Sequence, residues 1–136
     1  MKHLYLLLLY ASLLGACDHR KKVEIWIENV SVPGKAVQFT SFMGDSMIDQ
    51  RNVARDTVAD RVLSYFVYLP AGSSGERRFR FLAEGNKAET GCGVCIDSLK
   101  KGAFLHVRYE EQTIPGGMWS DSTETFRTFG CTVDYH

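Results

Sequence analysis

An alternation of apolar and polar residues with a period of two constrains the fold of this chain more than any other feature. In the first such segment, 23–28, Val23, Ile25 and Ile27 share one face and the residues between them face the other way. Because successive side chains of a strand point to opposite faces, this period indicates β-strands. Further segments with strand-forming residues between turn signals are 36–43, 61–69, 77–83, 91–97, 103–110 and 126–135.

About seven short strands with Gly-rich turns predict an all-β fold, a single β-sandwich of immunoglobulin-like or related two-sheet topology. The segment 61–69 is apolar on both faces, so we expect it in the middle of a sheet. Residues 44–56 are polar and carry no clean strand signal. The spacing of Ala54, Val58 and Val62 also fits a short helix near 52–62, which stays an alternative there.

The amino terminus has the layout of a secretory signal. Met1-Lys2-His3 carries positive charge, and 4–14 is almost wholly apolar but too short to span a membrane. The segment ends in Leu14-Gly15-Ala16-Cys17, and this ending resembles the lipobox of bacterial lipoprotein precursors.

The lipobox resemblance implies a processing scheme and an address. Residues 1–16 are expected to be removed, and Cys17 is expected to carry a covalent lipid, with palmitate among its acyl chains. The segment 17–22 would then be the lipidated tether and 23–136 the β-sandwich domain. The resemblance places the domain outside the cytoplasm, anchored in the bacterial cell envelope, and leaves inner and outer membrane open. No cofactor other than this lipid is expected.

The charge balance narrows the classes of partner. The formal net charge at pH 7 is zero, with charged residues scattered along the chain, which argues against nucleic acid. The expected partners are the membrane, through the lipid anchor, and either another envelope protein or a glycan.

With Cys17 lipidated, Cys92, Cys95 and Cys131 remain, and an oxidising compartment favours a disulfide among them. Cys131 paired with Cys92 or Cys95 would close a long loop; a local Cys92–Cys95 bridge is the other possibility. Read as a redox pair, Cys92-Gly93-Val94-Cys95 would resemble a thioredoxin-like motif, but no strand–helix pattern surrounds it.

Metal sites are not expected. The cysteines with His106 or His136 give only half of a zinc spacing signature. A second set of candidate ligands lacks the spacing and the closing glutamate of an EF-hand. These carboxylates are Asp45, Asp49, Asp56 and Asp60.

The segment 111–125 is predicted to be a long surface loop, and such loops often carry binding sites. Within it, Trp119 could stack on a sugar while Ser120 and Asp121 bond its hydroxyls; alternatively Trp119 caps the sandwich. The sequence therefore favours an anchored envelope lipoprotein with a binding or assembly module over an enzyme. The alternative is a thiol-disulfide redox protein using Cys92 and Cys95.

Overall fold

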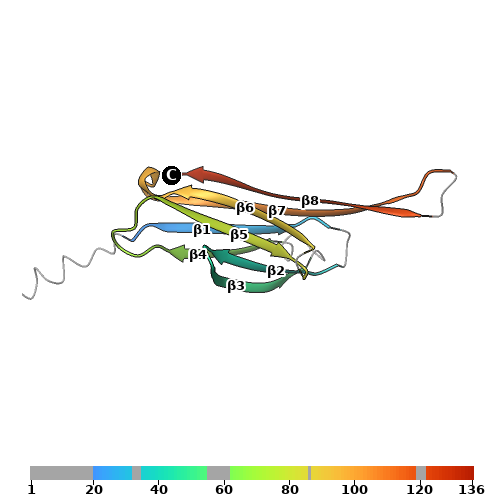
Figure 1. The fold of residues 1–136 in the computed structure, drawn as a ribbon, viewed down its shortest axis with the longest axis horizontal. Coiled ribbons are helices and arrows are strands. Elements are labelled where there is room, and N and C mark those ends of the chain that lie inside the picture. Colours follow the sequence, from blue (N-terminus) through green and yellow to red (C-terminus); the bar gives the residue numbers. More distant parts are fainter. Residues whose placement is uncertain (1–19, 32–34, 55–61, 86, 119–121) are drawn as a thin grey trace, which may run out of the picture.

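The structure of this protein is a computed structural model that describes residues 20–31, 35–54, 62–85, 87–118 and 122–136. These residues form eight strands and one short 3₁₀ helix (Figure 1). The elements are β1 (Lys22–Asn29), β2 (Val37–Met43), β3 (Ser46–Val53), β4 (Val62–Tyr68), β5 (Glu76–Ala83), β6 (Ala88–Cys95), η1 (Ile96–Ser98), β7 (Gly102–Pro115) and β8 (Thr123–Tyr135).

The strands form two four-stranded sheets packed face to face, so the predicted β-sandwich is confirmed. Sheet A has the order β4-β1-β7-β8, and sheet B has the order β3-β2-β5-β6. β1 and β7 run parallel, whereas all the other neighbours are antiparallel. No helix among the described residues is long and apolar enough to cross a membrane.

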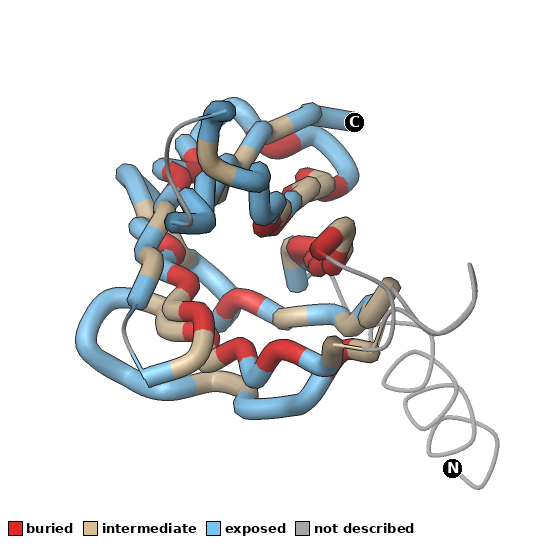
Figure 2. Tube along the Cα trace, turned by 90° about the vertical axis from the view of Figure 1, so that its right-hand side faces the viewer, coloured by how far each residue is buried: buried red, intermediate tan, exposed pale blue. Residues whose placement is uncertain are grey.

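The core forms because the period-two alternation sends one set of side chains between the sheets. Along β1, and along β7 as far as Glu111, every second residue is buried, and β5 repeats the pattern with Phe79 and Phe81. Figure 2 shows this alternation of buried and exposed positions along the trace. Burying such side chains contributes about 1.5–3 kcal/mol each, which makes the shared apolar interior the main stabilising term.

Two predictions about 44–62 need correction. β3 occupies Ser46–Val53, where no strand was expected, because β2 supplies an antiparallel partner along its whole length. Asn52 and Val53 belong to this strand and Val62 begins β4, so neither end of the predicted helix is helical. The middle of that helix, 55–61, lies outside the described residues.

β4 is an edge strand of sheet A, and the prediction that it is central was wrong. Its outward residues Phe66 and Tyr68 are 49% and 56% exposed. These two residues suggested that both faces of the strand are buried. An exposed aromatic residue on an open sheet face cannot be distinguished from a buried one in the sequence. Cations lie over both rings: Lys22 Nζ is 4.9 Å from the Phe66 centroid and Arg20 Cζ is 5.7 Å from that of Tyr68.

The predicted loop 111–125 is instead mostly strand. β7 continues to Pro115 and β8 begins at Thr123, and the two remain paired up to that end. Figure 1 shows them running on together beyond the ends of the other strands. We call residues 111–118 and 122–127 the arm. The β-branched residues Thr113, Thr123 and Thr125 favour extended backbone. Pro115 has no backbone N–H to donate to a neighbouring strand, and it is tolerated because it lies at the end of β7.

Candidate functional site

The arm is the most unusual part of the described structure because it has no neighbouring strand. The last pair between β1 and β7 is Asn29 with Tyr109, whereas pairing between β7 and β8 continues to Pro115 and Thr123. Within the described ranges, therefore, only two strands form the arm. A two-stranded ribbon is marginally stable in water at best, so an arm of this kind needs either a firm base or a partner.

Large apolar side chains are exposed along the arm. Ile114 is 48% exposed, Phe126 is 53% exposed, and Met118 at its outer end is 94% exposed. Ile114 pairs with Glu124 and Phe126 with Gln112, so Ile114 and Phe126 are diagonal neighbours on one face. Clustered apolar exposure on a strand pair with free edges is typical of a protein-binding element.

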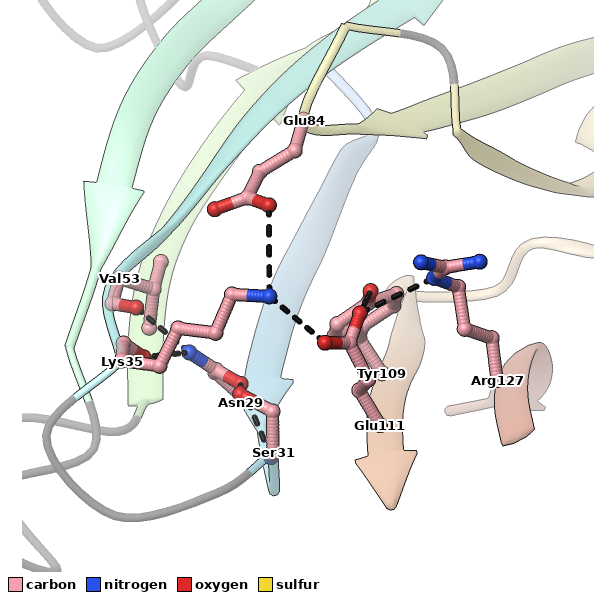
Figure 3. Close-up of polar contacts among 8 residues, drawn as sticks. All are labelled: Asn29, Ser31, Lys35, Val53, Glu84, Tyr109, Glu111 and Arg127. Carbon is pink, nitrogen blue, oxygen red and sulfur yellow. Dashed lines mark hydrogen bonds and ion pairs between the residues drawn. The ribbon is translucent and has the colours of Figure 1, made fainter. Parts of the chain in front are cut away.

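Glu111 lies at the base of the arm and is only 7% exposed (Figure 3). Its carboxylate accepts three hydrogen bonds: from Lys35 Nζ at 2.6 Å, from the Tyr109 hydroxyl at 2.8 Å and from Arg127 Nε at 3.0 Å. Lys35 Nζ also lies 3.8 Å from a carboxylate oxygen of Glu84. We call these five residues the base cluster.

The base cluster joins both sheets at the point where the arm leaves the sandwich. Glu111 and Arg127 belong to β7 and β8 of sheet A, whereas Glu84 directly follows β5 of sheet B. Tyr109 connects the cluster to the core, since its ring packs edge-on against Phe39 at 5.6 Å between centroids. The cluster therefore fixes the root of the arm to the body.

A second hydrogen-bond group positions Lys35. Asn29 Nδ2 donates to the carbonyl oxygens of Lys35 at 3.1 Å and Val53 at 2.7 Å. The side-chain oxygen of Asn29 accepts from the backbone N–H of Ser31 at 3.1 Å and also from its hydroxyl. Asn29 and Ser31 are fully buried, so these bonds satisfy polar groups that would otherwise be costly to bury.

The electrostatics of the base cluster follow from this geometry. The hydrogen bond from Lys35 is the largest cause that lowers the pKa of Glu111, to about 2, and Tyr109 and Arg127 lower it further. Burial, followed by the bond to the Glu111 carboxylate, raises the pKa of Tyr109 to about 12. Glu111 is thus ionised and Tyr109 protonated across the physiological range, which suits a permanent clamp rather than a proton-transfer site.

The cysteines resolve into one pair and one free thiol among the described residues. Cys92 on β6 is bonded to Cys131 on β8, with a Cα–Cα distance of 5.8 Å, so the disulfide links the two sheets. Cys95 is exposed and free. Cys92 points inward and Cys95 outward along β6, and a hydrogen bond from Ser98 lowers the pKa of the Cys95 thiol. The redox alternative stays a prediction.

The other candidate residues predicted from the sequence do not come together in one site within the described part of the chain. Cys17, Trp119, Ser120 and Asp121 lie outside the described residues. His106 lies 3.2 Å from Glu28, and Asp49 pairs with Arg51 at 3.0 Å. In the part of the chain that the structure describes, no group of three His, Cys, Asp or Glu residues could hold a metal ion.

A hollow of about 610 Å³ lies on the outer face of sheet B, over β5 and β6. It exists because Gly91 and Gly93 carry no side chain at outward positions of β6. Exposed charges of both signs line it, and Arg78 and Glu76 pair with each other at 3.2 Å. This lining favours no particular ligand.

The base cluster was missed at the level of sequence because Glu111 was assigned to a loop. One signal could have found it. Residues 103, 105, 107 and 109 are inward-facing, and continuing the alternation by one step places Glu111 on the inner face. A carboxylate at an inward position requires cationic or hydrogen-bonding partners.

The comparisons with known proteins give no assignment. No protein-family model matches this chain, and no curated protein matches it.

Proposed function

We propose that this protein is a lipid-anchored lipoprotein of the bacterial cell envelope, and that its β-sandwich is an assembly module that offers the arm to another envelope protein. The observation that carries the proposal is the arm itself. It is an unsupported strand pair that exposes Ile114, Met118 and Phe126. Main-chain groups on its free edges can pair with an added strand, and apolar side chains beside them supply specificity.

The position of the arm relative to the tether suits such a role. β1 starts beside the tether at Lys22 and runs parallel to β7, whose first residue, Gly102, is in register with it. The carboxyl terminus is at the same end, because His136 N–H donates to the Gly102 carbonyl at 3.0 Å. From Gly102 to Pro115 a strand advances about 40 Å. A lipid on Cys17 would therefore hold one end of the molecule and leave the arm at the other.

The base cluster supports the same proposal energetically. A free ribbon would lose conformational entropy on binding, which weakens an interface. The hydrogen bonds to Glu111 hold the root of the arm before any partner arrives, so part of this ordering is complete in the unbound protein.

The test is site-specific photo-crosslinking in envelopes of the native host, with the photoreactive amino acid at Ile114 or Phe126. A discrete adduct with another envelope protein is expected at both positions. The double variant I114S/F126S should lose co-purification of that protein, whereas Met47→Ser should retain it. Met47 is the matched control because it is 60% exposed and lies on β3 of the other sheet.

Two results would count against assembly through the arm. Crosslinks of equal yield at Met47 and Ile114 would show that the partner does not bind preferentially to the arm. A glycan that raises the melting temperature, with no protein adduct at either arm position, would favour glycan binding. Catalytic turnover in thiol-disulfide exchange that is lost both on Cys92→Ser and on Cys95→Ser would instead support the redox alternative.

A further inference from the structure

The outer face of sheet A carries a second exposed feature, separate from the arm. Aromatic rings lie there on the neighbouring strands β4, β1 and β7, and cations lie over two of these rings. Trp26, on β1, is 40% exposed and packs edge-on against Phe104 at 5.2 Å between centroids. We call the set the aromatic patch; it consists of Arg20, Lys22, Trp26, Phe66, Tyr68 and Phe104.

Strand register makes these residues one continuous surface. Lys22 is directly opposite Tyr68, and Glu24 is opposite Phe66 on one side and Phe104 on the other. Carboxylates also face this surface: Glu24 accepts a hydrogen bond from Trp26 Nε1 at 2.7 Å, and Asp134 on β8 is directly opposite Phe104. The surface therefore presents ring faces together with the cations of Arg20 and Lys22.

We propose that the aromatic patch docks on the anionic surface of the lipid bilayer beside the anchor. Trp and Tyr side chains prefer the headgroup level of a membrane, and Lys and Arg are attracted to anionic headgroups. The proposal rests on the lipid on Cys17 that we proposed above. The anchor alone does not determine which face of the sandwich contacts the membrane. The docking proposal specifies that this face is the outer face of sheet A.

The length of chain between anchor and patch selects the bilayer as the occupant. Arg20 follows Cys17 after two residues, and three residue steps span at most about 10 Å. The guanidinium over Tyr68 is thus held close to the attached lipid. Tethering at this distance makes docking intramolecular, so contacts too weak to bind a vesicle from solution are enough.

The experiment uses the lipidated protein reconstituted in phosphatidylglycerol/phosphatidylethanolamine vesicles and, separately, in phosphatidylcholine vesicles. Hydroxyl-radical footprinting with mass spectrometry measures the modification of each aromatic residue. Trp26, Phe66 and Tyr68 should be protected in the anionic vesicles and regain reactivity in high salt. Tyr135 is the internal control because it is 45% exposed and lies outside the patch.

Variants separate electrostatic docking from other causes of protection. Lys22→Gln should weaken docking in anionic vesicles about fivefold, as expected for the loss of one cation near such a surface. Lys87→Gln, a cation outside the patch, should leave protection unchanged. Equal reactivity of Trp26, Phe66 and Tyr68 in the two kinds of vesicle would overturn the proposal. Protection that rises with protein density in phosphatidylcholine alone would overturn it as well, because a second copy would then be the occupant.

The mass of the amino-terminal peptide distinguishes failure of the anchor from failure of the patch. If Cys17 carries lipid and the patch stays reactive, the docking proposal fails while the anchor stands. If Cys17 carries none, the anchor proposal fails, and the docking proposal that rests on it fails as well.

Discussion

Replacing Glu111 by Gln tests whether the base cluster is an electrostatic clamp. Gln has the shape of the protonated acid and lacks its charge, so the variant isolates the ionised state. The pKa of Glu111 is lowered from 4.5 to about 2 in the folded protein. At 1.36 kcal/mol per pKa unit, this shift corresponds to about 3 kcal/mol of folding free energy at pH 7.

The same shift sets the sign and range of the pH dependence. Because the folded pKa is below the unfolded one, the stabilisation is complete above about pH 5 and is lost as the pH falls towards 2. The penalty of E111Q should therefore decrease from about 3 kcal/mol at pH 7 to about 1.5 kcal/mol at pH 3.

Urea unfolding of both proteins at the two pH values, with the disulfide intact, measures this penalty. Glu110→Gln is the matched control. Its carboxylate is on the opposite face and lies 3.7 Å from Arg108 in an ion pair with more exposed side chains, so its loss should change stability by less than about 1 kcal/mol. A penalty for E111Q below 1 kcal/mol at pH 7, or one that does not decrease at pH 3, would refute the clamp.

Three further predictions concern the described residues. Tyr109→Phe removes one hydrogen bond to the Glu111 carboxylate and should cost about 1.5–3 kcal/mol, the range for bonds to charged groups; a loss under 0.5 kcal/mol in urea unfolding would contradict this. Removing the disulfide with C92A/C131A releases a loop of 39 residues and should cost about 4 kcal/mol, measured against the oxidised parent by thermal unfolding. Cys95 should react with iodoacetamide faster than a cysteine in an unfolded peptide at pH 7.5, because its thiol pKa is lowered chiefly by the Ser98 side chain; Ser98→Ala should slow the reaction, and an unchanged rate would exclude that cause.

The period of two in the sequence predicts most of the strands. The inward positions of β1, β5 and β7 could be read directly, because apolar residues recur there at every second position. A disulfide among Cys92, Cys95 and Cys131 was expected because the compartment is oxidising, either from Cys131 to one of the other two or locally between Cys92 and Cys95. The structure chose Cys92, since alternation along β6 turns Cys92 inward and Cys95 outward.

The order of strands could not be derived in the same way. Phe66 and Tyr68 made β4 look central, yet an aromatic residue on an open sheet face gives the same local pattern as a buried one. β3 was missed because most of its residues are polar and show no alternation; pairing with β2 makes them a strand. The residues of a segment show whether apolar and polar side chains alternate along it. The strand that pairs with the segment comes from elsewhere in the chain, so the segment itself does not show it.

The all-β class and the apolar faces of the strands could be predicted from local residue patterns, and the lipobox-like ending at Cys17 is visible in the sequence. The arm and its base cluster required the tertiary structure. Lys35, Glu84, Glu111 and Arg127 lie far apart along the chain, and no local pattern shows that they meet. An alternating strand can be recognised from its own side chains, whereas the clamp consists of contacts between strands, and these exist only after both sheets have packed.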